Sequence, residues 1–379
     1  MTSIQRMTIA IGFTQTMAWA TTFYVPATMV GPASVEIGAS PTALLGGFSM
    51  ALLVTGLMSP WVGRRIDRLG GRGVLAISTV VTASGLALMA AVPSLIAWYA
   101  AWMLMGVGMA MGLYDAAFGT IGRLLGAEAR PSIVGVTMMA GFASTIGWPA
   151  GTYLAAHIGW RWTLALYAGV QLCLLLPIIL AFVPRPQPVA LTSVKREHSG
   201  NAPAPRAFLF LAAYFTLRSG INAVIMVHAL TLLGGMGFSA AAAIGAATLI
   251  GPAQVGSRII DWFLGRGLNP MVMGVISAIL LPVAVVALLV GLPAAVFTLI
   301  YGLSNGILTI SRGTLPLHVF GPEGYAARIG RLALPALLAS AVAPTVVSPL
   351  MEAWPTSWVI ALMGGFSLLA SACLLGLRR

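Results

Sequence analysis

Long apolar runs alternate with short polar segments along the whole chain. A helix needs about 20 apolar residues to cross the hydrocarbon core of a bilayer, and twelve such runs can be marked in the sequence. Irregular backbone cannot face lipid, so each run is predicted to be helical. The runs are residues 7–31, 41–62, 73–92, 95–121, 132–156, 160–182, 207–233, 239–263, 270–290, 293–315, 330–348 and 357–377.

One long polar segment, VPRPQPVALTSVKREHSGNAPAPR at 183–206, divides the runs six and six. Its Pro, Ser and charged residues are typical of a linker. The segments VGRRIDRLGGR (62–72) and VGSRIIDWFLGRG (255–267) resemble each other at an offset of 193 residues, which indicates an internal repeat. We expect an all-α integral membrane protein with twelve transmembrane helices in two pseudo-symmetric six-helix bundles, residues 1–182 and 207–379.

Composition and charge agree with a membrane protein. The chain is 59% hydrophobic and only 7% charged, against about 25% charged residues in soluble domains. The net charge of +12 is a topology pattern, because every Lys and Arg except Arg161, Arg218 and Arg312 falls on the linker side. The positive-inside rule then places both termini and the linker in the cytoplasm. We expect a multi-pass protein of the cell inner (plasma) membrane, facing anionic inner-leaflet lipid, with no nucleic-acid partner.

Residues for enzymatic chemistry are missing from the sequence. Cys173 and Cys373 lie in apolar runs, and the four histidines are scattered without metal-ligand spacing. There is no phosphate-binding loop, serine elbow or paired carboxylate set. The sequence predicts no enzyme, no catalytic residue, no metal and no cofactor.

Residues 63–72, GRRIDRLGGR, resemble the loop 2–3 signature of the major facilitator superfamily, and Gly159-Trp160-Arg161-Trp162 resembles a feature at the outer end of its helices five and six. The resemblance covers the whole chain. Span four is similar to bacterial members near the monocarboxylate-porter branch, although those porters show an Asp–Arg pair in helix eight, and span eight here carries no charge before Arg258 at its inner end. Trp148 also splits the Gly-Pro pair of the family's antiporter motif.

The resemblance implies two bundles that rock around a central cavity lined by helices 1, 4, 7 and 10. It also implies that the loop 2–3 motif locks the inner face of the outward-open state. Asp67 would cap a nearby helix N-terminus; alternatively, the arginines of the motif only enforce topology. The residues of this lock are Gly63, Asp67, Arg68, Gly70 and Arg72.

Three charges fall inside predicted spans: Asp115, Arg218 and Arg312. Charges in a bilayer are costly unless paired or hydrated, so each is a functional candidate. Asp115 is the only acidic residue in a predicted membrane interior. The repeat places Asp115 and Arg312 within about 3 Å in depth, which predicts a gate that closes in one state and opens, or exchanges for a proton or substrate, in the other. Alternatively, each charge pairs within its own bundle.

Polar stripes at helical spacing accompany these charges. The three charges sum to +1, and a guanidinium binds carboxylate or phosphate with two hydrogen bonds, so we expect an anionic substrate. His228 is either a proton relay or a packing residue. Of Gln15 and Tyr24, at most one should face the cavity, because nine residues separate them on a straight helix. The candidate substrate-binding residues are Arg218, Tyr214, Asn222, Asn305, Thr309, Tyr114, Gln15 and Tyr24.

We therefore expect a monomeric secondary active transporter that moves a small organic anion by alternating access, linked to protons at Asp115. One alternative is proton-driven efflux of hydrophobic or cationic compounds with Asp115 as the cation site. Another is a non-transporting receptor or lipid-handling protein on the same fold, since fold does not fix function.

Overall fold

The computed structural model describes residues 2–185, 205–264 and 269–377, and most of the predicted linker lies outside them. The described residues are helical, with no β-strand among them. Nine helical stretches there are long and apolar enough to cross a membrane. One of these, Leu95–Phe182, folds back twice and supplies three passes. With the broken helix at the N-terminus, the twelve predicted passes are all present.

The first six passes contain several breaks. The helices are α1 (Ser3–Ala20) and α2 (Val25–Ile37), α3 (Pro41–Leu69), α4 (Gly71–Ala91), α5 (Leu95–Gly112) and α6 (Tyr114–Leu125), η1 (Gly126–Glu128), α7 (Ala129–Ala140), α8 (Ala143–Val170), the π-helical turn η2 (Gln171–Leu175) and α9 (Leu176–Phe182). Gly159, at φ 81°, turns the chain inside α8 and separates the fifth pass from the sixth. This backbone conformation is open to glycine and strained for other residues.

The last six passes are more continuous. They are α10 (Pro205–Gly235), α11 (Ala240–Thr248) with α12 (Ile250–Leu264), α13 (Pro270–Leu289), α14 (Ala294–Phe320), α15 (Tyr325–Ala353) and α16 (Thr356–Gly376). Serine caps start several passes: the side chains of Ser40, Ser94 and Ser239 each accept a hydrogen bond from the N–H three residues on, which satisfies one free donor of the helix end.

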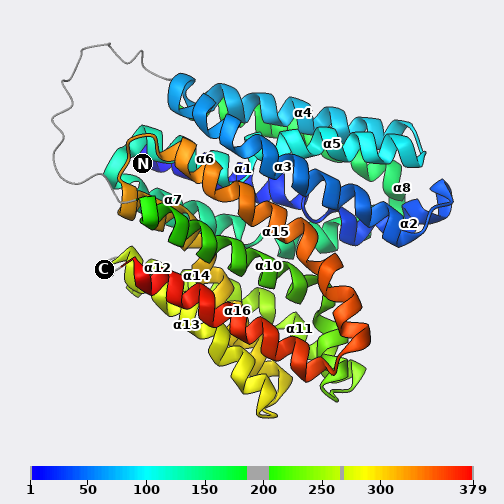
Figure 1. Cartoon of the computed structure of the whole chain (residues 1–379). Coiled ribbons are helices and arrows are strands. Elements are labelled where there is room, and N and C mark those ends of the chain that lie inside the picture. Colours follow the sequence, from blue (N-terminus) through cyan, green and yellow to red (C-terminus); the bar gives the residue numbers. More distant parts are fainter. Residues whose placement is uncertain (1, 186–204, 265–268, 378–379) are drawn as a thin grey trace.

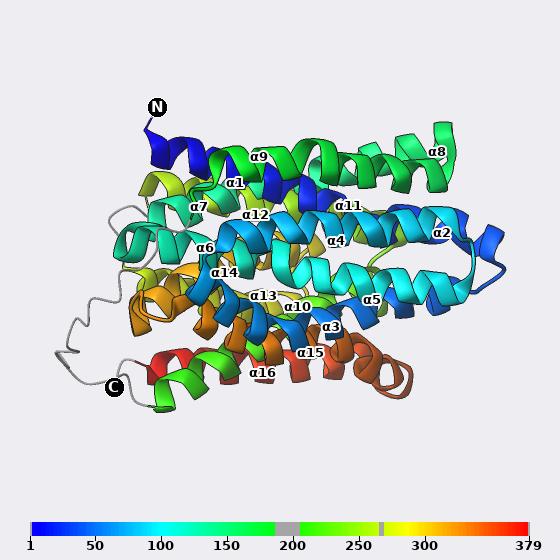
Figure 2. The same cartoon turned by 90° about the horizontal axis from the view of Figure 1, so that it is seen from above.

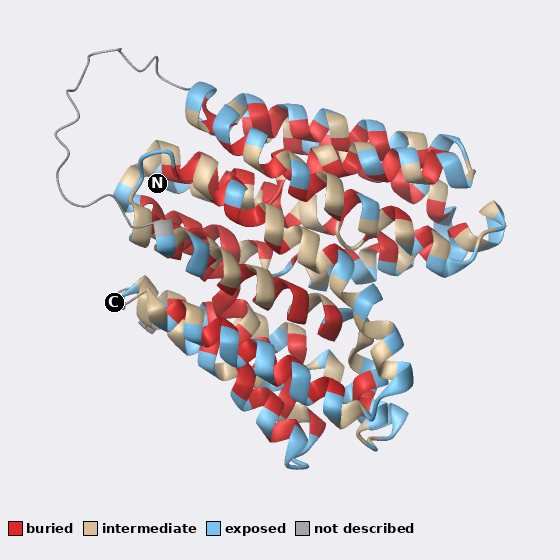
Figure 3. Cartoon of the chain, in the orientation of Figure 1, coloured by how far each residue is buried: buried red, intermediate tan, exposed pale blue. Residues whose placement is uncertain are grey.

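Apolar side chains cover the outside of the helices, as expected where lipid replaces water. Leu57, Val227 and Phe263 are 64%, 64% and 73% exposed, whereas buried positions concentrate where the helices meet (Figure 3). Several hydroxyl and amide side chains lie inside, among them Gln15 and Gln171. The chain is a multi-pass membrane protein.

The two bundles meet near the end of the molecule that carries both termini, which we call the linker end, and diverge toward the other, the far end (Figures 1 and 2). Across the bundles, α15 packs along α3 and on α6, and α7 packs on α12 and α14. At the far end, α2 packs on α3 and α8 of its own bundle, and α11 packs on α10, α12 and α14 of its own. The molecule is therefore closed at the linker end.

Candidate functional site

Asp67 joins the two bundles at the linker end. It lies in the last turns of α3, because this helix continues to Leu69; the motif predicted as a loop is therefore largely helical. Its carboxylate accepts hydrogen bonds from the backbone N–H groups of Ala326 (3.2 Å) and Ala327 (2.8 Å). These N–H groups open α15, whose N-cap, Gly324, has no side chain to satisfy them. Asp67 supplies that cap from the other bundle, and its negative charge faces the positive end of the helix dipole.

The other motif residues surround this contact. A Cβ at Gly63 would overlap the backbone of Ala326, so only glycine lets α3 and α15 approach this closely. Gly70, at φ 80°, ends α3 and begins α4. Arg72 donates to the carbonyl oxygen of Leu180 within its own bundle, and Arg68 is exposed. The geometry joins Asp67 and Gly63 to α15; the locking role stays a prediction.

Asp115 and Arg312 form an ion pair across the bundles, with Nη2 of Arg312 and Oδ2 of Asp115 3.4 Å apart. The fourth pass breaks at Leu113, so Asp115 lies in the first turn of α6, where the helix dipole favours a negative charge. The side chains of Arg312 and Asp115 are 28% and 20% exposed. The structure therefore shows the predicted pairing between bundles rather than pairing within each, while its function as a gate stays a prediction. A void of about 10 Å³, lined also by Phe215 and Ile329, lies beside the pair.

Arg258 corrects the sequence interpretation. It lies in α12, within the predicted span, but it was counted with the cytoplasmic topology charges, whereas only 5% of its surface is exposed. Its Nη1 donates to the carbonyl oxygen of Thr137 in the first bundle (3.2 Å), and its Nη2 donates to Oγ1 of Thr309 (3.4 Å). Its Nε has no hydrogen-bond partner among the described residues. The guanidinium is within electrostatic range of two predicted substrate contacts, Tyr24 and Tyr114.

Asp261 also lies inside the protein. It is 2% exposed near the end of α12, and its Oδ1 has no hydrogen-bond partner in the described part of the chain. Gln254, Arg258 and Asp261 form a polar stripe at helical spacing. This stripe was visible in the sequence, but the segment was used only as evidence for the internal repeat with residues 62–72.

Arg218 lies inside the second bundle rather than at the surface between the bundles. It is 2% exposed, its Nη2 donates to Oγ of Ser304 (2.7 Å), and its Nε and Nη1 have no partner among the described residues. Tyr214 is fully buried beside it, and its hydroxyl group donates to the backbone carbonyl oxygen of Gly274 at 3.5 Å. Asn222 accepts a 2.5 Å hydrogen bond from the hydroxyl of Tyr301. The predicted role of these residues in substrate binding stays a prediction.

Gln15 faces the interior of the first bundle, where it is 2% exposed. Tyr24 is half-buried at the start of α2, and its ring meets the ring of Trp148 edge-on at 6.0 Å. Tyr114 stacks on Phe118 at 5.1 Å.

Three further candidates lie on α10 and α14. His228 donates from Nε2 to the carbonyl oxygen of Pro344 at 3.2 Å, a packing contact between α10 and α15. Asn305 is half-buried on α14, and its backbone carbonyl oxygen accepts a hydrogen bond from Oγ1 of Thr309. Thr309 thereby joins Arg258 to α14.

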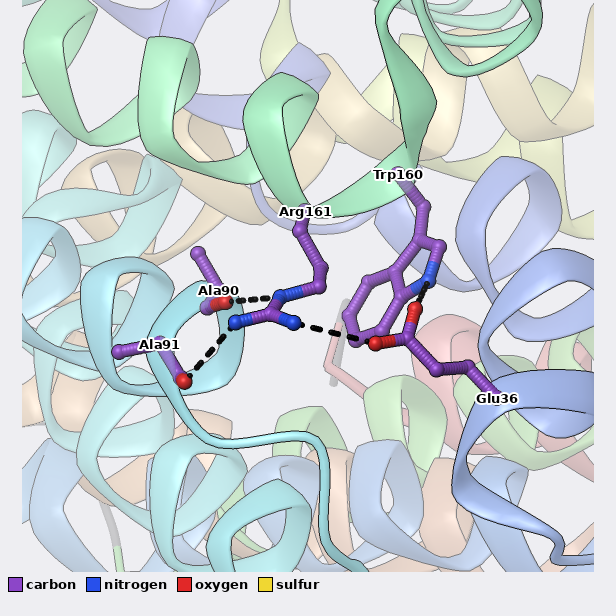
Figure 4. A network of polar contacts seen from close by, with 5 residues as sticks. All are labelled: Glu36, Ala90, Ala91, Trp160 and Arg161. Atoms are coloured by element: carbon purple, nitrogen blue, oxygen red, sulfur yellow. Dashed lines mark hydrogen bonds and ion pairs between the residues drawn. The ribbon is translucent and has the colours of Figure 1, made fainter.

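A polar network closes the far end of the first bundle (Figure 4). Arg161 pairs with Glu36 at 3.1 Å and donates to the last carbonyl groups of α4, Ala90 (2.7 Å) and Ala91 (3.0 Å). The indole N–H of Trp160 donates to the other oxygen of Glu36 at 2.7 Å. Arg161 thus caps the negative end of α4 and fixes the end of α2, within one bundle and away from the contacts between bundles.

The described residues contain no group of three or more His, Cys, Asp or Glu that could hold a metal ion. The chemistry that the site offers is ion pairing, hydrogen bonding and charge compensation, carried at the contact between the bundles by the guanidinium groups of Arg258 and Arg312 and the carboxylates of Asp67 and Asp115.

Comparison with known proteins places this geometry in a family. Residues 7–326 match the family model described as Major Facilitator Superfamily. No curated protein matches the chain. The human organic anion transporter MFSD10 (TETRAN) has a similar crystal structure, with a TM-score of 0.76, 17% identity, and coverage of 99% of this chain and 100% of that chain.

Two other solved structures are similar over nearly their full lengths. The transporter FucP in its outward conformation gives a TM-score of 0.76 at 10% identity, covering 100% of both chains. The proton:xylose symporter XylE gives 0.74 at 15% identity, covering 98% of this chain and 95% of that chain. At these identities the similarity shows the fold.

Proposed function

The chain belongs to the major facilitator superfamily, and we propose that it is a secondary active transporter that moves a small organic anion by alternating access, coupled to protons. The solved structures with this fold include an organic anion transporter and a sugar symporter, so the fold does not choose the substrate. The choice rests on the charges between the bundles.

Arg258 carries the proposal. It lies between the bundles, its contacts are a carbonyl and a hydroxyl oxygen, and no ion pair within 4.0 Å involves it in the described part of the chain. Removing a charge from water without an opposite charge costs several kcal/mol. A carboxylate or phosphate would supply that charge and form two hydrogen bonds with the guanidinium. An anion is therefore the ligand that this position favours most.

Asp115 and Arg312 provide the proposed coupling. While Asp115 is charged, the pair holds α6 against α14 at the linker end. Protonation of Asp115 would remove its attraction for Arg312 and weaken that closure. We assign the linker end to the cytoplasm, because the basic residues of the sequence collect there. The described state would then open outward.

Flux measurements in proteoliposomes test the proposal. Uptake of small radiolabelled mono- and dicarboxylates is measured with and without an imposed pH gradient. We expect gradient-dependent anion uptake that falls at least tenfold in Arg258→Met, since the variant keeps an unbranched apolar stem but loses the charge and the hydrogen-bond donors. The matched control is Arg64→Met, an exposed arginine at the linker end, which should retain uptake.

Three results would contradict the proposal. Full anion uptake by Arg258→Met would remove the residue on which it rests. Efflux of hydrophobic cations that depends on Asp115 and not on Arg258 would support the drug-efflux alternative. Ligand binding without flux of any compound would support a receptor.

A further inference from the structure

A small polar cavity lies inside the first bundle, away from the contact between the bundles. Its volume is about 20 Å³, while a single water needs about 10–15 Å³. It therefore has room for one guest of atomic size. Its walls come from α1, α4, α5 and the sixth pass, and its polar lining includes Thr14, Gln15, Thr22, Ser78, Thr79 and Gln171.

Three hydroxyl groups of this lining offer oxygen lone pairs rather than hydrogens. Thr14 donates its hydrogen to the carbonyl oxygen of Ile11 (3.0 Å), Ser78 to Leu75 (2.6 Å), and Thr79 to Ala76 (2.8 Å). A hydroxyl has one hydrogen and two lone pairs, so these three groups can only accept a further partner.

Gln15 adds a further acceptor, its side-chain oxygen Oε1. Its Nε2 donates to the carbonyl oxygen of Gly112 at 2.6 Å, which turns the amide and leaves Oε1 buried without a hydrogen bond among the described residues. The residue is 2% exposed. Buried polar groups without partners are rare and call for an explanation such as an unseen ion or water.

Two helix C-termini lie near the same place, one of them next to the start of α6. The first pass stops at Ala20, where α1 ends, and the fourth stops at Gly112, where α5 ends. The C-terminal end of a helix carries roughly half a negative charge, and such half-helix ends coordinate cations in discontinuous membrane helices. The described residues that line the cavity include no Lys or Arg.

The second bundle holds a positive charge at the corresponding place. There Arg218 extends from α10 to Ser304 on α14, and the hydroxyls of Ser277 and Ser304 each donate to the other's carbonyl oxygen between α13 and α14. The helices α10, α13 and α14 are the first, third and fourth passes of their bundle, as α1, α4 and α5 are of theirs. In the second bundle a guanidinium of the chain itself lies among these acceptors; the first bundle has Gln15 and a cavity.

We propose that this cavity binds one dehydrated sodium ion, held by Oε1 of Gln15 and hydroxyl oxygens of the lining. A divalent ion would need carboxylate ligands, and no carboxylate lines the cavity among the residues that the structure describes; potassium is larger than the space favours. The bound ion would tie α1 to the break in the fourth pass, three residues before Asp115. This inference goes beyond the proposed function and does not depend on which substrate is carried.

Thermal unfolding of the purified, detergent-solubilised protein tests the site without any transport substrate. Its midpoint is measured in NaCl, KCl and choline chloride at one pH and ionic strength. We expect a saturable rise with sodium of about 5 °C, the size given by a ligand near a hundred times its Kd, and little change with potassium or choline. Thr79→Val should weaken the apparent sodium affinity at least tenfold, because it keeps the shape and removes the oxygen. The control Ser367→Ala removes a buried hydroxyl with the same kind of backbone bond in the second bundle and should keep the response.

Gln15→Glu separates an ion from a water. A carboxylate in a cation site should raise the apparent sodium affinity about tenfold at alkaline pH, whereas beside a bound water it would lower the midpoint in all three salts. Equal midpoints in sodium, potassium and choline would overturn the proposal and indicate a water-filled cavity. A sodium response that survives both Thr79→Val and Gln15→Leu would also overturn it. Because no flux is measured, failure here leaves the anion-transport proposal standing, and failure of anion flux leaves this site standing.

Discussion

Replacing Asp67 with asparagine should open the linker end. The carboxylate accepts two N–H groups at the start of α15, and hydrogen bonds to a charged group are worth about 1.5–3 kcal/mol each when buried. The asparagine side chain would keep one neutral acceptor of similar size and lose the charge that faces the helix dipole, itself worth about 0.3–1 kcal/mol. Discounting for the half-exposed position, we expect the closed state to lose about 1.4 kcal/mol, or about tenfold in population.

Double electron–electron resonance, which measures the distance between two spin labels, would detect this shift in population. Spin labels at Arg64→Cys and Glu323→Cys, both exposed positions near the facing ends of α3 and α15, report the separation of the bundles in a background without the two native cysteines. Asp67→Asn should raise the ratio of the long-distance to the short-distance population about tenfold. The matched control is Glu128→Gln, an exposed carboxylate near the same end. An unchanged distribution in Asp67→Asn would refute the assignment of Asp67 as an inter-bundle cap.

Three further predictions concern contacts of the same kind. Asp115→Asn should also shift the label distances toward the open state and reduce gradient-driven flux. The double exchange Asp115→Arg with Arg312→Asp should restore part of the closed population. If the double exchange gives the same distances as either single change, a direct pair is refuted. Gly330→Ala places a methyl group against the α3 backbone and should prevent closure, while Gly251→Ala, which has open space around its Cα, should not; equal distance distributions would contradict this. Glu36→Gln breaks a 3.1 Å pair that is 41% exposed on each side, so it should lower the unfolding midpoint by only about 1–2 °C and leave the label distances unchanged.

The fold was predictable because lipid imposes simple rules. Apolar length fixes where helices run, the linker divides them six and six, and the basic residues predict which side each loop faces. The Asp115–Arg312 pairing also followed from the sequence, because the repeat relates depth in one bundle to depth in the other. That inference needs only the rise per residue of a helix, which helix breaks such as the one at Leu113 change little.

What a helix faces was harder to predict. Arg218 was expected to line the space between the bundles, and so was at most one of Gln15 and Tyr24; Arg218 and Gln15 are each buried against helices of their own bundle. A polar stripe shows that one side of a helix avoids lipid, and a helix in a bundle has protein on several sides. Arg258 was missed for a different reason. Because its segment resembles the loop after span two, Arg258 was counted as a topology charge. Its helical spacing relative to Gln254 and Asp261, which places all three on one face of α12, was therefore not used.

The positions of Arg258 and Asp115 suggest how substrate and proton could act on the same movement. Arg258 reaches the first bundle through the carbonyl oxygen of Thr137, so an anion that binds the guanidinium competes with a contact between the bundles. Protonation of Asp115 weakens another such contact, the one with Arg312. A ligand shifts a conformational equilibrium only by its difference in affinity for the two states, and here both ligands replace interactions that exist in the closed state. In the proposed cycle each one therefore favours separation of the bundles at the linker end, and binding of one raises the affinity for the other although they bind to different residues.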